Sequence, residues 1–381
     1  MSRAVYITAS AAFLPNAPVD NTQIESVLGQ VGPRPSRAKR IVLKSNGIRL
    51  RHYALDVTSR VATHSNAEMT AEAVRALFAP GAVQTTALVC GTSTPDQTMP
   101  NHAVMVHGEL GVPIREVVAT SGICLSGFSA LKFAYLGVTA GDYASAVATG
   151  SDLPSALLRA ECFTSECAAQ VRQLQEHREL AFEKDFLRWM LSDGAGALLL
   201  EPRARPPSLA LRIDWIDLFS AADVLPTCMY AGAQECQGQI VGWMQLDAEA
   251  RTAAPVMAIK QDVRLLNDNV VRACFENPLR DLMARRNLIQ GPIDWFLPHM
   301  SSMYFAPALA AVVKTLALPI ADTAWFTNLC RCGNTGAASI YIMLDELLHS
   351  GRLRAGQTIL CMVPESGRFS SGFMHLTVCQ G

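Results

Sequence analysis

Short runs of apolar residues recur along the chain and predict buried strands. Most of these runs lack the polar-apolar alternation of a strand with one wet face, which is typical of parallel strands covered on both sides. The first run has one positive charge and is interrupted by Thr8, Ser10 and Pro15, so a buried strand fits it better than a secretory segment. The runs are residues 3–14, 117–120, 144–152, 198–200, 293–297 and 358–363.

Helical spacing separates several of these runs. Phe128, Leu131, Tyr135 and Val138 recur every three or four residues up to Gly141, and residues 306–316 and 334–348 follow the same period. A strand, a helix and a second strand predict a right-handed parallel crossover. The sequence therefore predicts an α/β protein.

Two segments share one layout and suggest a divergent internal repeat. Cys124–Asp152 and Asn334–Gly367 each run from a polar turn through a helix rich in small residues to an apolar strand. The stiff segment Arg203–Pro207 lies between them and marks a boundary, which predicts halves at 1–205 and 206–381. Residues 162–189 are more charged in their first part, and the pattern fits equally a helical insertion over a pocket and a surface connection.

Composition narrows the function classes. The net charge is −1 and half of the 381 residues are hydrophobic, which argues against a nucleic-acid-binding protein and against disorder. Lys314 divides the longest apolar candidate, residues 306–320, so no membrane span is predicted. Eleven cysteines, an odd number in a long chain, favour a reducing cytoplasm.

Cys124 is the best candidate nucleophile on position. It lies between the predicted strand ending at Thr120 and a predicted helix from about Leu125. The N–H groups at a helix N-terminus can lower a thiol pKa from ~8.5 toward 7. The alternative is a small buried hydrophobic residue, which is the commoner role of a free cysteine.

His299 and Asn334 are weaker candidates when taken alone. His299 follows a buried strand, where α/β sheets place ligand-contacting residues, but a core or surface histidine is the more frequent case. Asn334 precedes a predicted helix, where Asn is most often an N-cap, although its amide could also donate into a pocket. No cysteine pair has zinc-ligand spacing, so no metal site is predicted.

A basic stretch precedes the first motifs. Residues 34–52 contain seven Lys or Arg and no acidic residue. Arg40, Lys44 and Arg49 could contact a coenzyme A phosphate or an acidic carrier protein, and a solvated loop is an equal alternative.

Four ordered motifs resemble the β-ketoacyl carrier-protein synthase III family over nearly the whole chain. The first surrounds Cys124, and two short segments upstream fit the same order. The matching segments are Ile114–Phe128, Ser192–Ala197, Trp295–His299 and Gly333–Ile340, preceded by Leu14–Asn16 and Asn46–Arg49.

The resemblance implies the thiolase fold, with two related halves stacked in five layers, and a homodimer. It implies Cys124 as the acyl-accepting nucleophile, with His299 and Asn334 holding the thioester carbonyl of the second substrate. The N–H groups of Cys124 and Gly367 would form the oxyanion hole for acylation. No cofactor is implied, because coenzyme A or the phosphopantetheine of an acyl carrier protein carries the substrates.

Three departures from the family point away from primary fatty-acid initiation. Met300–Ser302 replaces the usual Gln-Ala-Asn, Val363–Ser370 replaces a glycine-rich tail, and Ser36–Lys44 lacks the expected aromatic residue. The first two resemble the branch that joins two acyl thioesters into a cyclohexanedione, the precursor of dialkylresorcinols. In that branch Met99 would reach into the partner's acyl tunnel, and related enzymes often carry a Glu base near this position, where this chain has only the nearby Asp96.

The sequence thus favours a ketosynthase that condenses two acyl thioesters through acyl-Cys124, in secondary metabolism. An acyltransferase that forms esters or amides, with His299 as general base, is the first alternative. A non-catalytic partner subunit is the second, and the presence of Cys124, His299 and Asn334 argues against it.

Overall fold

The computed structural model describes residues 3–31, 39–163, 187–253, 256–286, 288 and 291–381. Two sets of strands dominate it. The N-terminal set runs in the spatial order β5-β4-β6-β7-β1, and the C-terminal set in the order β8-β15-β14-β13. Their bounds are β1 Tyr6–Phe13, β4 Ala87–Thr92, β5 Glu116–Ser121, β6 Ala146–Asp152, β7 Gly194–Glu201, β8 Leu209–Ser220, β13 Trp295–Pro298, β14 Thr358–Glu365 and β15 Ser370–Gln380.

The two sets are joined at one corner. β1 and β8 pair only at Tyr6–Arg212 and Ile7–Leu211, so the nine strands form one continuous sheet by hydrogen bonding but diverge into two layers. β5, β4 and β6 are parallel neighbours, as are β13 and β14, and the remaining neighbours are antiparallel.

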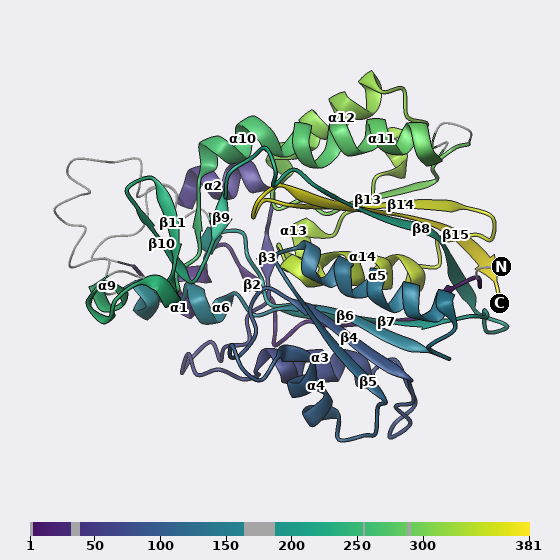
Figure 1. The fold of residues 1–381 in the computed structure, drawn as a ribbon, viewed down its shortest axis with the longest axis horizontal. Helices are drawn as coiled ribbons and strands as arrows, with labels where there is room; N and C mark the ends of the chain where they lie inside the picture. The colour runs from purple at the N-terminus through teal and green to yellow at the C-terminus, as the bar shows by residue number, and fades with distance from the viewer. Residues whose placement is uncertain (1–2, 32–38, 164–186, 254–255, 287, 289–290) are drawn as a thin grey trace.

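Helices separate and cover the two layers of strands (Figure 1). α5 and α14 lie between the layers, α3 and α4 cover the N-terminal layer, and α10, α11 and α12 cover the C-terminal layer. This is the predicted five-layer order, αβαβα. The bounds are α3 Asn66–Arg75, α4 His102–Leu110, α5 Leu125–Ala140, α10 Val263–Val271, a π-helical turn Arg272–Glu276, α11 Asn277–Arg286, α12 Ala306–Thr315 and α14 Ser339–His349.

Smaller elements surround one end of this stack. They carry several of the residues that line the pockets described below. They are β2 Val19–Asp20, α1 Ile24–Leu28, α2 Lys39–Asn46, β3 Leu50–Arg51, α6 Ser155–Leu158, β9 Met229–Tyr230, β10 Ala233–Cys236, β11 Gln239–Gly242, α9 Ala248–Ala253, β12 Lys260–Gln261 and α13 Leu329–Cys332, with 3₁₀ turns at Ala160–Phe163, Trp243–Gln245, Met303–Phe305, Asp322–Ala324 and Gly336–Ala338.

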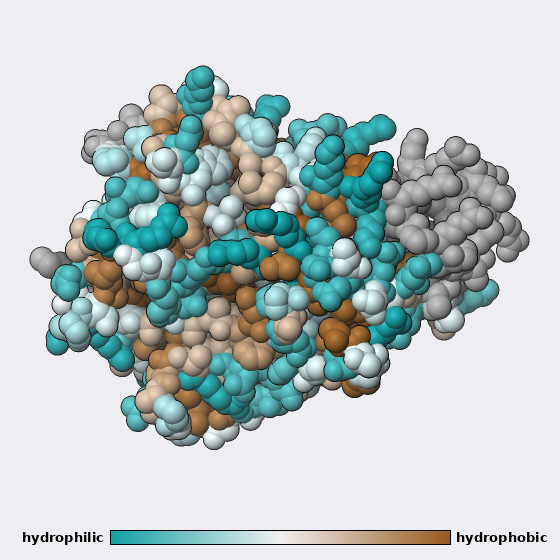
Figure 2. Space-filling view, turned by 180° about the vertical axis from the view of Figure 1, so that it is seen from behind, coloured by the Kyte–Doolittle hydropathy of each residue, from teal (hydrophilic) through white to brown (hydrophobic). Residues whose placement is uncertain are grey.

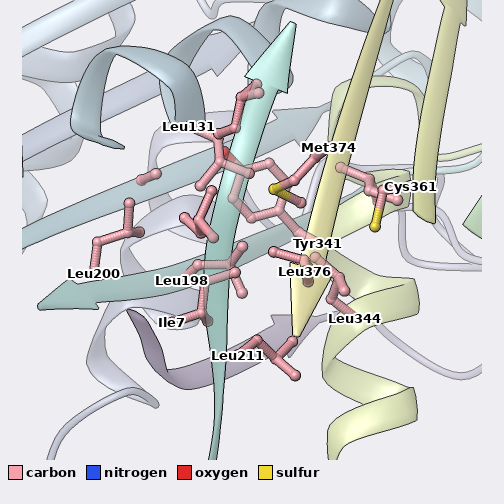
Figure 3. Close-up of a cluster of buried hydrophobic side chains, with 14 of the residues drawn as sticks. Ile7, Leu131, Leu198, Leu200, Leu211, Tyr341, Leu344, Cys361, Met374 and Leu376 are labelled. Carbon is pink, nitrogen blue, oxygen red and sulfur yellow. The ribbon is translucent and has the colours of Figure 1, made fainter. Parts of the chain in front are cut away.

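The central helices bury side chains against both layers. Leu131 of α5 and Tyr341 of α14 lie in one apolar cluster with Leu198 of β7 and Met374 of β15 (Figure 3). Gly127 lets α5 approach the other half of the chain, since a Cβ there would lie 2.4 Å from the Ala337 carbonyl oxygen. The Tyr341 hydroxyl donates to the Gly127 carbonyl at 2.7 Å and holds this contact.

The predicted strands and helices are confirmed, with shifted ends, but the strand predicted as buried at residues 117–120 is only partly buried, because β5 lies at the edge of the sheet. The helix predicted from Asn334 begins at Ser339, after the 3₁₀ turn Gly336–Ala338. β8 and β15, the long antiparallel pair of the C-terminal layer, have no counterpart among the predicted elements. Of the region 162–189, residues 164–186 lie outside the described residues, so the two interpretations of that region stay open.

The halves predicted at 1–205 and 206–381 correspond in position to the two layers of strands, and the boundary itself stays a prediction. In the described part of the chain, no helix has the length and apolar character needed to cross a membrane. The face shown in Figure 2 mixes exposed hydrophobic residues with hydrophilic ones.

Candidate active site

Cys124 lies at the turn between β5 and α5, directly before the first residue of the helix. Its side chain is partly buried and lines two pockets, which also share Ser301 and Ser366. We name the pockets by the predicted site residue that each contains: the His299 pocket and the Asn334 pocket. The structure therefore places all three predicted catalytic residues around one junction, although they come from distant parts of the sequence.

Both pockets have walls that are mainly apolar. The C-terminal helices α10 and α12 contribute to the His299 pocket, and the segment 187–191 contributes to the Asn334 pocket. The His299 pocket includes Leu266, Val270, Phe275, Phe305, Leu309 and Met362. The Asn334 pocket includes Pro154, Leu187, Met190, Leu191, Met229 and Ile259. Two apolar spaces thus meet at the thiol.

His299 directly follows β13, and its backbone N–H donates to the Met362 carbonyl of β14 at 2.8 Å. Only 3% of the residue is exposed. Burial lowers the pKa of His299 to about 4. The imidazole is therefore neutral at pH 7 and has one N–H donor and one acceptor nitrogen.

Asn334 is held by its backbone rather than by a helix. Its N–H donates to the Met190 carbonyl at 3.0 Å, and its side-chain Oδ1 accepts the Gly336 N–H at 3.0 Å. The expectation that Asn334 is an N-cap is therefore wrong, because α14 begins five residues later and Asn334 closes a local turn instead. With Oδ1 occupied, the Nδ2 group is the donor left for a ligand in the pocket.

The expected low pKa of Cys124 is also wrong. Burial raises the pKa of the thiol well above its usual value, and the negative charges of Asp152 and Glu365 raise it further. The helix N-terminus was expected to favour a thiolate, but the Glu365 carboxylate already accepts the N–H groups of Ile123 and Leu125 on either side of Cys124. At neutral pH the resting nucleophile is a protonated thiol.

Glu365 is the site residue that sequence reasoning missed. It ends β14, and its Oε2 accepts the N–H of Ile123 at 2.9 Å and of Leu125 at 3.1 Å. Burial raises the pKa of this carboxyl, while the two hydrogen bonds act in the opposite direction. The segment Val363–Ser370 was singled out only as a departure from the family, and spacing offers no sign that residue 365 contacts residue 123.

Gly367 lies against the nucleophile turn, as its assignment to the oxyanion hole requires. A Cβ on Gly367 would lie 2.8 Å from the Cδ1 atom of Ile123. Its carbonyl accepts the N–H groups of Cys228 and Met229. The role of the Gly367 N–H in an oxyanion hole stays a prediction.

Met99 is not among the residues that line either pocket of its own chain. It is 84% exposed, so its predicted role in a partner's tunnel stays a prediction. The nearby Asp96 is engaged elsewhere, because its two carboxylate oxygens accept the N–H groups of Asn66 and Ala67 at the start of α3.

The basic residues lie on and after α2. Arg40, Lys44 and Arg49 are exposed, and the Arg49 Nε donates to Cys330 Sγ at 2.8 Å. Residues 32–38, which hold Arg34 and part of the Ser36–Lys44 departure, lie outside the described residues. Contact with coenzyme A or a carrier protein stays a prediction.

Within the described ranges, no group of three or more His, Cys, Asp or Glu side chains has an arrangement suited to a metal ion. The absence of a metal cofactor stays a prediction.

Comparison with known proteins agrees with this geometry. Residues 283–372, which include His299 and Asn334, match the domain described as 3-Oxoacyl-[acyl-carrier-protein (ACP)] synthase III C terminal. The Beta-ketoacyl-[acyl-carrier-protein] synthase III of Bordetella petrii is 25% identical over 377 residues, covering 96% of this chain and 95% of that protein.

Solved structures share the fold along the whole chain. AbyA1, a tetronic acid condensing enzyme, aligns with a TM-score of 0.73 at 18% identity, covering 98% of this chain and 99% of that one. The 3-oxoacyl-(acyl carrier protein) synthase III of Pseudomonas aeruginosa aligns with a TM-score of 0.71 at 21% identity, covering 98% of each chain.

The five layers and these structural matches define an α/β protein with the thiolase fold. Within that class, the chain is similar over nearly its whole length to β-ketoacyl-ACP synthase III, and residues 283–372 match the C-terminal domain of that enzyme. The resemblance to the synthase III family stated from the sequence motifs is thereby confirmed, and the resemblance to the cyclohexanedione-forming branch stays a prediction.

Proposed function

We propose that this protein is a ketosynthase that joins two acyl thioesters by a Claisen-type condensation through an acyl-Cys124 intermediate. The observation that carries the proposal is the junction at Cys124, where two mainly apolar pockets meet at one thiol. One pocket can hold the acyl chain on sulfur while the other admits the second thioester.

The reaction balances in two steps. Cys124 Sγ attacks the first thioester, and the carrier thiol leaves with the proton of Cys124. A C2 carbanion of the second thioester then attacks the acyl group, a carbon-carbon bond forms, and Cys124 is released and reprotonated. The carbanion arises by loss of a C2 proton or, from a malonyl donor, by loss of CO₂.

His299 and Asn334 would stabilise the enolate oxygen of the second thioester. A neutral imidazole N–H and a carboxamide N–H lower the energy of such an oxyanion without a proton transfer. The lowered pKa of His299 supports this role, as does the Nδ2 of Asn334, which donates to no other residue in the described part of the chain. The N–H groups of Cys124 and Gly367 would bind the other oxyanion, which forms during acylation.

The substrates are acyl chains on coenzyme A or on acyl carrier protein, with Arg40, Lys44 and Arg49 as contacts for the carrier. The departures at Met300–Ser302 and Val363–Ser370 favour a secondary-metabolic product, with a cyclohexanedione as the specific candidate. We further propose a cytoplasmic homodimer in which Met99 enters the partner's acyl tunnel. Phe133 and Leu136 of α5 are apolar and exposed, which supports an interface with a second subunit over this face of the helix.

Acylation tests the nucleophile. We expect incubation with acyl coenzyme A to add one acyl group to the Cys124 peptide, as measured by mass spectrometry. Cys124→Ala should abolish the label, while Cys236→Ala, a change at an exposed cysteine on β10, should leave it unchanged. A label on another cysteine, or none with any acyl donor, would reject the assignment.

Product analysis tests the condensation. A β-ketoacyl thioester and an α,β-unsaturated acyl thioester should give a product with a new carbon-carbon bond, identified by mass spectrometry and NMR. Hydrolysis products alone would count against the cyclohexanedione version.

An acyltransferase that forms esters or amides is the second candidate. The neutral His299 supports it, because the acceptor nitrogen of the imidazole could take a proton from a hydroxyl or amine. Supplying acyl-Cys124 with alcohols and amines, without a second thioester, separates the two functions by product.

A further inference from the structure

The carboxylate of Glu365 bonds the residues on both sides of the nucleophile. Its Oε2 atom alone accepts the N–H groups of Ile123 and Leu125. These two amides belong to the turn that leads into α5, whereas Glu365 comes from the end of β14, 240 residues later in the chain. One oxygen atom therefore ties the nucleophile turn to the C-terminal half.

The amide between these two remains available. Among the described residues, the Cys124 N–H donates to no other residue, while both of its neighbours are engaged by Glu365. Acylation of Cys124 by a thioester needs this N–H directed at the carbonyl oxygen of the thioester. Because Glu365 holds the amides of Ile123 and Leu125, the amide of Cys124 between them is left for the substrate.

The location of the carboxylate fits a supporting role rather than direct contact with substrate. Pro364 and Ser366 line the pockets, whereas Glu365 between them does not. Instead its side chain lies against two glycines: a Cβ on Gly122 would lie 3.3 Å from Oε2, and one on Gly367 would lie 3.4 Å from Oε1. The turn and the carboxylate are packed together.

We propose that Glu365 is the positioning residue of the nucleophile turn, which binds the Ile123 and Leu125 amides so that the Cys124 N–H and thiol face the thioester. The proposal rests on the proposed acylation of Cys124 and adds to it the residue that orients the reacting groups.

The charge of Glu365 has a separate, measurable consequence. Asp152 on β6 and Glu365 on β14 both raise the pKa of Cys124, and His299, the titratable group across the His299 pocket, is neutral. Removing the charge of Glu365 should lower the pKa of Cys124 and increase its thiolate fraction at pH 7.5.

Two substitutions separate the hydrogen bonds from the charge. Glu365→Gln keeps an oxygen that can accept both amides but removes the charge, whereas Glu365→Ala removes both. Asp56→Asn is the matched control, because one oxygen of Asp56 likewise accepts two amides, those of Thr58 and Ser59, and Asp56 lines neither pocket. The measurements are the rates of iodoacetamide alkylation and of acylation by acyl coenzyme A, both on the Cys124 peptide.

We expect both Glu365 variants to be alkylated several-fold faster than wild type at pH 7.5. Acylation should fall by at least about tenfold in Glu365→Ala, because small misplacements of reacting groups have effects of that order, and Glu365→Gln should restore it to within about threefold of wild type. Asp56→Asn should leave both rates unchanged. Opposite movements of the two rates in the Ala variant would not follow from a general loss of stability.

Equal acylation of wild type and Glu365→Ala would overturn the role of Glu365 while leaving the proposed function intact. Parallel loss of both rates in the Ala variant, or failure of Gln to restore acylation, would also overturn it. Absence of acyl-Cys124 in the wild type would reject the proposed function itself, and this proposal with it.

Discussion

His299 and Asn334 are assigned to one step of the reaction and Cys124 to an earlier one, and substitution can distinguish the two steps. In the proposed mechanism His299 and Asn334 bind the second thioester, so they are not needed for the transfer of the first acyl group to Cys124. Acyl-Cys124 formation and carbon-carbon bond formation should therefore respond separately.

We expect His299→Ala and Asn334→Ala each to slow condensation by about 10²–10³-fold, the usual effect of losing one oxyanion donor. Acylation of Cys124 should change by less than about tenfold. Single-turnover mass spectrometry of the acyl-enzyme, combined with product quantification, measures both steps. Equal losses in the two steps would contradict the assignment of these residues to the second substrate.

At the scale of elements, different helices and loops line the two pockets and would therefore contact different acyl chains. α10 contributes Val270 to the His299 pocket, and the segment before β12 contributes Ile259 to the Asn334 pocket. A bulky side chain at either position should reduce the length of the acyl chain that this pocket accepts and leave the other pocket unchanged.

We therefore expect Val270→Trp and Ile259→Trp to shift chain-length preference for different substrates of the pair. In each variant kcat/KM for one of the two thioesters should fall tenfold or more when its acyl chain is long and stay unchanged when it is short. The reason is that Trp fills space that a long chain would occupy. Competition between chain lengths, read by mass spectrometry, measures the shift. Identical preference changes in both variants would contradict separate chain sites.

The contact between α5 and α14 gives a stability prediction at the same scale. Gly127→Ala should lower the free energy of unfolding by about 1–3 kcal/mol, because its Cβ would lie 2.4 Å from the Ala337 backbone oxygen. Gly108→Ala in α4 is the matched control: a Cβ there meets nothing within 4 Å, and Ala favours the helix. Chemical denaturation should show destabilisation in the first variant only.

At the scale of the whole molecule, buried carboxyl groups link folding to pH. Burial raises the pKa of Asp193 to about 7, while its side chain accepts hydrogen bonds from Ala54 and Ser155. The folded protein therefore holds a proton on Asp193 between about pH 4 and 7, where the unfolded chain does not. This contribution is full below about pH 4 and is lost as the pH rises through 7.

Accordingly, the free energy of unfolding of wild type relative to Asp193→Asn should decrease from pH 5 to pH 8. Denaturant titrations at several pH values measure this difference, with the Asn variant supplying the reference in which residue 193 does not titrate. A difference that is constant or that increases over this range would contradict the raised pKa.

The predictable part of the fold came from local patterns. The apolar runs became β1, β5, β6, β7, β13 and β14, because continuous hydrophobicity is typical of strands covered on both faces, although β5 at the sheet edge is only partly buried. β8 and β15 were missed since their burial varies irregularly along the strand, which weakens any period. α14 begins at Ser339 rather than at Asn334, because Gly336 has a φ of 54° and the 3₁₀ turn Gly336–Ala338 precedes the helix.

The candidate site also has a part that the sequence predicted and a part that it did not. Motif order identified Cys124, His299 and Asn334 as candidates, and the pockets bring them to one junction. The predicted thiolate was wrong, because the helix N-terminus was considered without the burial of the thiol and without the carboxyl groups of Asp152 and Glu365, which raise its pKa. No local pattern reports which residue from another strand will occupy a given amide.

The sequence alone determined the alternation of strands and helices and the chemical types available at their ends, because hydrophobic period and residue identity are local properties. Only the tertiary structure decided that Glu365 lies at the amides beside Cys124, that Asp96 is already bound at α3, and that two apolar pockets converge on the thiol. Charge and hydrogen bonding act over a few ångströms in space, irrespective of the number of residues between the groups along the chain.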